Sequence, residues 1–236
     1  MNGGYCGNIL EVNLSNHRIH TRKLDENYAK NYIGGRGLGA RYLFDEQPEQ
    51  ADPLSDKNTI ITMTGPFTGT TIPTCHRFMV ITKSPLTKKY LCCSCGGHFG
   101  AELKFSGHDG IIIKGRSDRP AYIKIDDEDV EISAADHLVG KYSDEAQTMI
   151  QEEVGRDFRV ASIGPAGEKL VKIACVQFGA RSASRGGMGA VWGSKNLKAI
   201  AVRGTKEVQL ANADAVREYI KKTYSELANK QPFQNY

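Results

Sequence analysis

The chain has 236 residues, of which 40% are hydrophobic and 25% charged, and its formal net charge is +4. These values are typical of a globular protein and leave room for one large core or two small ones. Lys and Arg are dispersed along the sequence, which excludes the basic stripe of a nucleic-acid binder. No run approaches the roughly 20 apolar residues that a membrane helix needs.

The start of the chain and its cysteines bear on the compartment. Residues 1–5 lack the charged start and apolar run of a signal peptide, so we expect a cytoplasmic protein. Cysteines stay reduced there, which makes them candidates for metal ligation, reactivity or packing rather than for a disulfide framework. The six cysteines are Cys6, Cys75, Cys92, Cys93, Cys95 and Cys175.

The first half of the chain predicts a hairpin, two helices and two strands. Apolar and polar residues alternate over residues 8–14 and return over 18–24 after a turn, as in a β-hairpin. A helix is expected from Asp25 to the stop at Gly34-Gly35, and a second, shorter helix over residues 38–44. Residues 59–64 and 78–82 are predicted strands because they are rich in β-forming side chains.

The second half predicts a further hairpin over residues 121–133, a helix from about 143 to 154, and strands over 160–163, 171–177 and 199–202. Helices interrupt hairpins without regular βαβ alternation, which indicates an α+β fold. Residues 214–236 are predicted to be helical until Pro232 and to begin a following domain. The expected domains are therefore 1–210 and 211–236.

The most informative feature is a pattern that occurs twice. In each copy a Gly-Pro turn is followed by a basic segment, a Gly-Gly turn with small residues, and an apolar strand that ends in a basic residue and glycine. The first copy runs from Gly65-Pro66 to Gly115 and the second from Gly164-Pro165 to Gly204. Gly96 to Gly115 is 19 steps and Gly186 to Gly204 is 18, and this matching spacing predicts two halves of one duplicated unit.

Each copy places arginine near its Gly-Gly turn. Glycine permits positive φ and lets backbone N–H groups approach a ligand that a Cβ would hold off, and arginine is a natural partner of phosphate. Two such turns suit a ligand with two phosphates, unless the glycines only close turns where two halves pack. The candidate binding residues are Arg77, Gly96, Gly97, Arg181, Arg185, Gly186 and Gly187.

Two other glycine motifs fail on context. The segment from Gly35 to Ala40 satisfies the G-x-G-x-x-G/A fingerprint, but a predicted helix precedes it where a dinucleotide site needs a strand. The segment from Gly189 to Lys195 lacks the G-K-[ST] order of a P-loop. Neither segment is therefore expected to bind a nucleotide.

A cysteine cluster leaves an alternative open. Cys92-Cys93-Ser94-Cys95 contains one C-x-x-C, which could be a redox pair or half of a zinc or iron–sulfur site. A second C-x-x-C is absent from the sequence, so buried or bystander thiols are the simpler interpretation. A thiol site at Cys92 and Cys95 remains the alternative.

Long segments in consistent order resemble the N-terminal domain of the tungsten-dependent aldehyde ferredoxin oxidoreductases. The resemblance covers residues 5 to about 210. Its most specific segments are Gly65-Pro66-Phe67-Thr68-Gly69-Thr70, Thr82-Lys83-Ser84-Pro85-Leu86-Thr87, Ser162-Ile163-Gly164-Pro165-Ala166-Gly167-Glu168 and Gly193-Ser194-Lys195-Asn196-Leu197-Lys198.

The resemblance implies two mixed β-sheets related by a pseudo-twofold, and a base for a bis-pyranopterin cofactor of tungsten, or sometimes molybdenum, whose phosphates are bridged by magnesium. Backbone carbonyls of Ser94 and Ser182 would reach that magnesium. Ser94 replaces an asparagine of the family, a change that a backbone ligand survives. The matching contact positions are Arg77, Ser94, Gly96, Arg181 and Ser182.

The activity implied for a complete enzyme is anaerobic oxidation of aldehydes to carboxylic acids, with electron transfer through pterin and a 4Fe-4S cluster to ferredoxin. The cluster ligands would lie in later domains, so this segment is expected to be inactive alone. The expected partners are those domains, ferredoxin, an aldehyde and a second copy in a homodimer, but no nucleic acid or membrane. The alternatives are a stand-alone phosphate- or nucleotide-binding module and a thiol- or metal-dependent redox protein using Cys92 and Cys95.

Overall fold

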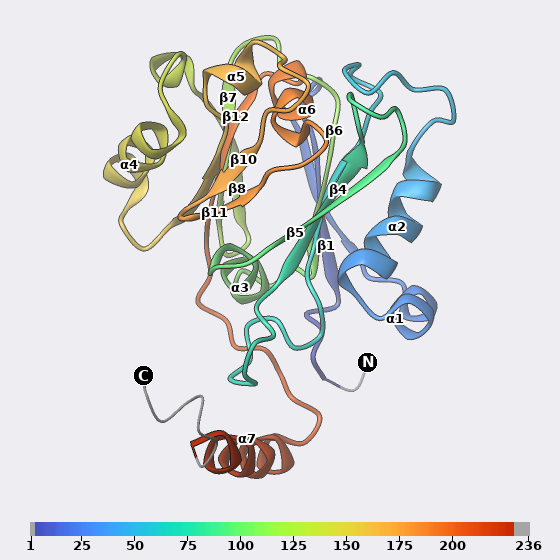
Figure 1. Ribbon diagram of the computed structural model, residues 1–236, viewed down its shortest axis with the longest axis vertical. Helices are drawn as coiled ribbons and strands as arrows, with labels where there is room; N and C mark the ends of the chain where they lie inside the picture. Colours follow the sequence, from blue (N-terminus) through green and yellow to red (C-terminus); the bar gives the residue numbers. More distant parts are fainter. Residues whose placement is uncertain (1–2, 229–236) are drawn as a thin grey trace.

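The computed structural model describes residues 3–228, which form two β-sheets with helices on their outer faces and at their ends (Figure 1). The helices are α1 (Glu26–Tyr32), α2 (Gly35–Glu46), α3 (Phe99–Phe105), α4 (Ser143–Val154), α5 (Pro165–Glu168), α6 (Met188–Ser194), α7 (Ala213–Ala228) and a 3-10 turn at Asp136–Leu138. The strands are β1 (Asn8–Asn13), β2 (Arg18–Lys23), β3 (Ile60–Met63), β4 (Phe78–Lys83), β5 (Tyr90–Cys95), β6 (Gly110–Lys114), β7 (Ala121–Asp126), β8 (Asp129–Ala134), β9 (Arg159–Ser162), β10 (Val176–Phe178), β11 (Arg181–Ala183) and β12 (Leu197–Arg203).

The two sheets repeat one topology. Read from one edge, the first sheet has the order β5-β4-β3-β6-β1-β2, and the second has the order β11-β10-β9-β12-β7-β8. In both sheets the pair in the fourth and fifth positions is parallel, β6 with β1 and β12 with β7, and the other neighbours are antiparallel. The predicted α+β fold of two mixed sheets is confirmed, and strand order and direction show the duplication that the sequence repeat predicted.

The largest apolar cluster lies between the sheets. Ile111 and Ile113 of β6 point into it, whereas Ile112 belongs to a second cluster under α1 and α2. In the other half, β12 sends Ile200 to the central cluster and Ala201 to a third cluster under α4. These strands read as continuous apolar runs because both of their faces are covered. Full burial of one isoleucine side chain is worth about 2 kcal/mol.

Aromatic rings close one end of the central cluster. Phe178 makes edge contacts with Phe78 and Phe99, each at 5.0 Å between ring centroids, and with Trp192 at 6.4 Å. These rings come from β10, β4, α3 and α6, so they join the two halves. The start of β4 and the β10–β11 hairpin are thereby held near each other, and the candidate site lies there.

Two predicted elements differ from the structure. Of the predicted strand 171–177 only residues 176 and 177 belong to a strand, β10, because the preceding residues form a turn and irregular backbone next to α6. A Cβ on Gly189 would lie 2.4 Å from the carbonyl oxygen of Cys175, so the two backbones pack too closely for a sheet partner to fit between them. The second helix is longer than predicted, since α2 begins at Gly35 and ends at Glu46.

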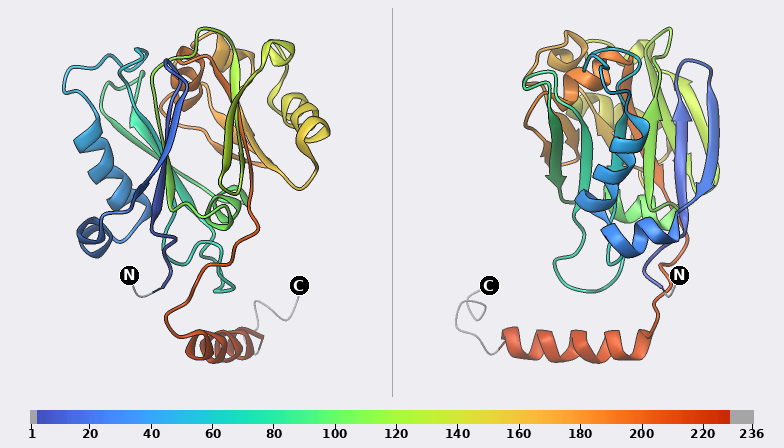
Figure 2. Two further views of the ribbon diagram at one scale, coloured as in Figure 1. Left: turned by 180° about the vertical axis from the view of Figure 1, so that it is seen from behind. Right: turned by 90° about the vertical axis from the view of Figure 1, so that its right-hand side faces the viewer.

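Helix α7 stands apart from the sheets (Figure 2). It has no buried side chain among the residues that the structure describes. The division of the chain near residue 210 stays a prediction, and residues 229–236, including Pro232 where the predicted helix ends, lie outside the described part. Within residues 3–228, no helix is long and apolar enough to cross a membrane.

Candidate cofactor cradle

The candidate site lies where the two halves meet at their edge strands. Strands β5 and β11 occupy the corresponding edges of the two sheets and lie next to each other. An edge strand has a row of backbone N–H and C=O groups without a partner strand. The meeting of two such edges therefore offers backbone oxygens from both halves of the molecule.

A polar hollow of about 410 Å³ opens at this junction. We name it the cradle. In the described part of the chain it is lined by both candidate serines and two candidate arginines, and by no carboxylate. Its lining residues are Arg77, Ser94, Cys95, Gly96, Gly97, Ala180, Arg181 and Ser182.

Arg77 and Arg181 give the cradle its positive charge. Arg77 directly precedes β4, and its Nη1 donates a hydrogen bond to Ser94 Oγ at 3.1 Å. Arg181 begins β11, and no ion pair or hydrogen bond of its guanidinium occurs within residues 3–228. Both arginines are exposed. Exposed guanidinium groups without a carboxylate partner are available to an anionic ligand, and phosphate oxygens can accept two parallel hydrogen bonds from one guanidinium.

The two glycines after β5 differ in what they allow. A Cβ on Gly96 would meet nothing within 4 Å, so this position leaves open space in the cradle. Gly97 has a φ of +95°, and a Cβ there would lie 3.7 Å from Cγ of Arg181. The turn needs glycine at position 97 for its backbone conformation, whereas glycine at 96 keeps this part of the cradle open.

The second glycine pair does not lie in the cradle. Gly186 has a φ of +70° and packs against Leu91 of β5, where a Cβ would come within 2.5 Å of Cδ1. Gly187 has a φ of +84°, and a Cβ there would lie 2.3 Å from the carbonyl oxygen of Lys172. Arg185 is exposed outside the cradle lining. The packing alternative, in which glycines close turns between halves, describes this second pair.

The cysteines of β5 are divided between its faces. Cys92 packs against the cluster under α2, whereas Cys93 and Cys95 belong to the core between the sheets. Burial raises the pKa of Cys95 to about 11 and also raises that of Cys93, so both thiols are protonated at neutral pH. The structure does not bring Cys92 and Cys95 together. Within the described chain, no group of three or more His, Cys, Asp or Glu gathers to hold a metal.

Two cradle residues were missed by sequence reasoning. The C-x-x-C pattern indicates only a thiol role for Cys95, although this residue lies between Ser94 and Gly96 at the end of β5. Ala180 lies in the short connection between β10 and β11, and that hairpin was hidden by the strand predicted over 171–177. The repeat itself could have located it, because the β10–β11 hairpin corresponds to β4–β5.

The fold and the cradle together define a class, a duplicated two-sheet α+β domain with a cationic hollow where its halves meet. The family model described as "Aldehyde ferredoxin oxidoreductase, N-terminal domain" matches residues 9–204. The chain therefore belongs to the aldehyde ferredoxin oxidoreductase family, whose named members are oxidoreductases.

Curated relatives agree with this assignment. Over 226 residues the chain is 50% identical to the tungsten-containing aldehyde ferredoxin oxidoreductase of Pyrococcus horikoshii, a match that covers 95% of this chain and 37% of that protein. It is 30% identical over 250 residues to the protein named aliphatic sulfonate oxidoreductase, WOR-like subunit, of Pyrococcus furiosus, covering 98% of this chain and 40% of the relative. The chain thus spans well under half the length of these relatives.

A solved structure shows the same fold. The active site complex BamBC of benzoyl coenzyme A reductase, in complex with 1,5-dienoyl-CoA, superposes with a TM-score of 0.88 at 37% sequence identity. The superposition covers 98% of this chain and 37% of that chain. The family is therefore supported by sequence and by structure.

Proposed function

We propose that this chain forms the base for a tungsten, or molybdenum, bis-pyranopterin cofactor in an enzyme that oxidises aldehydes to carboxylic acids. The observation that carries this proposal is a cradle with two arginines, no carboxylate in the described residues, and backbone from both edge strands. Tungsten is the first choice of metal because the relative from Pyrococcus horikoshii is named a tungsten-containing enzyme. The cofactor, when bound, would supply the redox chemistry, and the protein would supply binding and electrostatics.

The residues of the cradle fit the phosphate end of such a cofactor. Arg77 and Arg181 would neutralise phosphate charge, and Gly96 would leave space for the phosphates to approach the backbone. Phosphates that are held from both halves would also fix the cofactor's orientation. The hydrogen bond from Arg77 to Ser94 holds one guanidinium ready beside the edge of β5.

Magnesium would be held between Ser94 and Ser182. Magnesium prefers oxygen ligands and keeps several waters, so two backbone carbonyls together with ligand phosphates are a suitable set. Both serines lie on edge strands and line the cradle. A site of this kind needs no cluster of acidic side chains.

The complete reaction would need more protein than this chain provides. We propose that it acts with the remaining domains of a protein of its relatives' length, since it matches 37% of the Pyrococcus horikoshii enzyme. Those domains would hold a 4Fe-4S cluster that passes electrons to ferredoxin in an anaerobic cytoplasm. The chain alone would be inactive, and a homodimer would be the assembled form.

The cradle can be tested without the complete enzyme. Inorganic pyrophosphate with Mg²⁺ imitates the magnesium-bridged phosphates, and its binding to this chain is measurable by isothermal titration calorimetry. Loss of one charge-assisted contact in Arg77→Gln should weaken binding by about tenfold or more. Arg119→Gln changes an exposed arginine outside the cradle and is the matched control. Equal binding by the two variants would contradict the proposal.

A further inference from the structure

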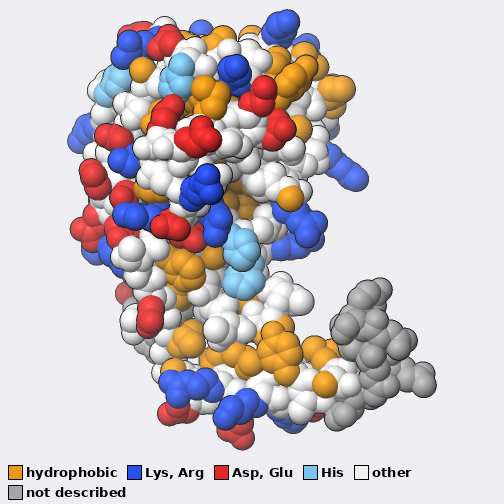
Figure 3. All heavy atoms as spheres, turned by 90° about the vertical axis from the view of Figure 1, so that its left-hand side faces the viewer, with side chains coloured by type: hydrophobic (Ala, Val, Ile, Leu, Met, Phe, Trp, Pro, Cys, Tyr) orange, Lys and Arg blue, Asp and Glu red, His pale blue; other side chains and the backbone are white. Residues whose placement is uncertain are grey.

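A second pocket, lined by polar and apolar side chains alike, adjoins the cradle on the side of α4. Its volume is about 420 Å³, and it shares Gly97, Ala180 and Arg181 with the cradle. We name it the α4 pocket. Figure 3 shows Lys and Arg side chains beside histidine side chains on the face that carries α4. Of the residues that line this pocket, the cofactor function proposed above uses only Arg181.

The α4 pocket is cationic. Arg159 from the start of β9, Arg181 from β11 and His98 from the turn before α3 line it, and no carboxylate does so among the described residues. The side chains of Arg159 and His98 form no ion pair or hydrogen bond within residues 3–228, and both residues are exposed at the pocket. Two guanidinium groups around one hollow, without an acidic partner, provide a site for a small anion.

Two glutamines of α4 add fixed acceptors. Gln147 Nε2 donates to Ser162 Oγ at 3.1 Å, and Gln151 Nε2 donates to the carbonyl oxygen of Phe158 at 2.8 Å. Their amide orientations are set by these bonds, and both Oε1 atoms lack a hydrogen bond in the described chain. A carbonyl oxygen accepts from a hydroxyl and repels a phosphate oxygen. The lining thus offers guanidinium groups to a phosphate and amide oxygens to hydroxyls, beside the apolar side chains of Phe99, Val160 and Phe178.

We propose that the α4 pocket binds a small hydroxyl-bearing phosphate ester from solution, separately from the phosphates of the cradle. Arg159 would be its main contact with the phosphate, and Arg181 would be shared between the two sites. A ligand of this chemistry would lie directly beside the phosphate end of the proposed cofactor. Arg77, which lines only the cradle, and Arg159, which lines only the α4 pocket, allow the two sites to be separated.

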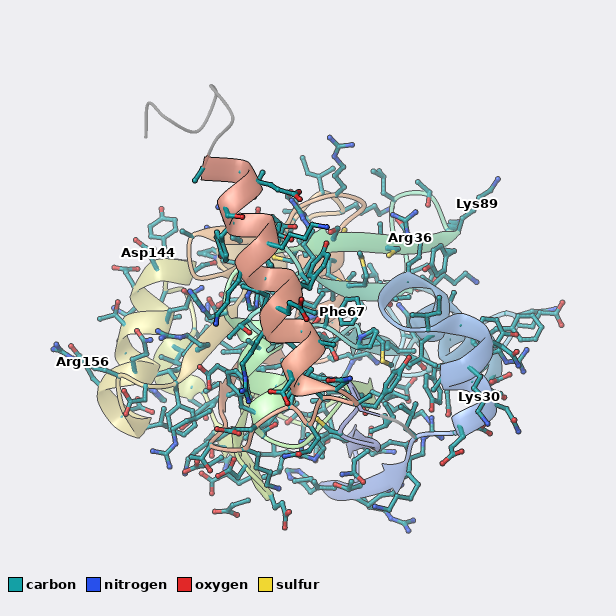
Figure 4. All side chains as sticks on the ribbon, turned by 90° about the horizontal axis from the view of Figure 1, so that it is seen from below. Lys30, Arg36, Phe67, Lys89, Asp144 and Arg156 are labelled. Atoms are coloured by element: carbon teal, nitrogen blue, oxygen red, sulfur yellow. The ribbon has the colours of Figure 1, made fainter. Side chains whose placement is uncertain are left out.

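Glycerol 3-phosphate is a suitable probe. It would be titrated into this chain at low ionic strength with EDTA present, so that the magnesium-dependent cradle does not contribute, and binding would be followed by backbone amide chemical shifts. Arg159→Gln should weaken binding by about tenfold, the effect of one charge-assisted contact. Arg156→Gln is the matched control because Arg156, just beyond α4, points away from the body of the protein (Figure 4). Arg77→Gln should also leave this binding unchanged.

Three results would overturn the inference. The first is that glycerol 3-phosphate does not bind at millimolar concentration. The second is that Arg159→Gln binds it as well as wild type does. The third is that Arg77→Gln and Arg159→Gln weaken binding equally, which would indicate one site in the cradle. Thermal unfolding of each variant verifies its fold. The proposed function has its own readout in magnesium pyrophosphate binding, so failure of either proposal can be recognised without the other.

Discussion

Ser94 and Ser182 occupy equivalent positions in the two halves of the molecule. Ser94 is the residue before the end of β5 and stands opposite Met79, the second residue of β4. Ser182 is the residue before the end of β11 and stands opposite Gln177, the second residue of β10. Both serines line the cradle. The internal duplication therefore places two equivalent backbone segments at one hollow.

This equivalence predicts that the serine side chains matter less than their backbones. Ser94→Ala and Ser182→Ala keep both carbonyl groups, and Ser94→Ala loses only the hydroxyl that accepts from Arg77. Each variant should bind magnesium pyrophosphate within about tenfold of wild type, since the hydrogen bond lost in Ser94→Ala, from a charged guanidinium to an exposed hydroxyl, is worth about 1.5 kcal/mol. Calorimetric titration measures this. A loss of a hundredfold or more would show that the hydroxyls themselves are ligands.

The two Gly-Gly turns should respond differently to substitution. Gly96→Ala adds a methyl group in open space, so it should change the free energy of unfolding by less than about 1 kcal/mol. It should nevertheless weaken magnesium pyrophosphate binding, because it narrows the cradle. Gly187→Ala combines a φ of +84° with a 2.3 Å approach to the carbonyl oxygen of Lys172, and should cost about 2 kcal/mol or more. Denaturant unfolding of both variants, with the titration of Gly96→Ala, measures the difference.

This contrast explains how far the sequence could predict the site. The repeat predicted Arg77 and Gly96 in one half and Arg181 in the other. Ser94 and Ser182 were implied by the family resemblance, and they line the cradle with the other three. The repeat also suggested that Gly186-Gly187 should act like Gly96-Gly97, which the structure does not support. The first pair directly follows its edge strand, whereas Ser184 and Arg185 separate the second pair from β11. A short insertion moves a turn away from a site without changing its residue types.

The sequence predicted two kinds of strand correctly. The apolar runs of β6 and β12 were predictable because both faces of these strands are covered. The hairpins β1–β2 and β7–β8 were predictable because apolar and polar side chains alternate along their strands. The strand predicted over 171–177 was wrong for residues 171–175, because Val171 and Ile173, which have high β-propensity, are exposed in the segment next to α6. Their conformation is set by close approach to Gly187 and Gly189, a tertiary contact that local propensity does not contain.

Stability should fall in mild acid because of one buried histidine. Burial, together with the positive charge of Lys206, lowers the pKa of His108 to about 4. In the unfolded chain this histidine is protonated near pH 6.5. Between about pH 6.5 and 4 the unfolded state therefore binds more protons than the folded state. As the pH falls through this range, the free energy of unfolding should decrease by about 3 kcal/mol in total.

Unfolding by urea at several pH values tests this expectation. His108→Gln should show a smaller loss of stability between pH 6.5 and 4 than wild type does. His17→Asn replaces an exposed histidine at a φ of +55°, which asparagine tolerates, and should keep the wild-type pH dependence. A His108→Gln variant with the full wild-type slope would contradict the assignment.

The buried pair of Lys104 and Asp109 should fix the N-terminal segment to the body of the protein. Lys104 Nζ donates to Asp109 Oδ1 and to the carbonyl oxygen of Gly4, each at 2.6 Å. Lys104→Met should cost about 3–5 kcal/mol, because it leaves the carboxylate buried without its charge partner. Lys30→Met breaks an exposed pair with Glu26 and should cost less than about 0.5 kcal/mol. Similar losses in the two variants, measured by urea unfolding, would contradict this role.

The most direct test of the cofactor function is the tungsten, molybdenum and pterin content of the protein, produced at the length of its relatives and purified without oxygen. The proposed function predicts tungsten or molybdenum together with pterin in the wild type, and loss of most of both from Arg77→Gln/Arg181→Gln. Zinc or iron without pterin in the wild type, or full pterin content in the double variant, would contradict it.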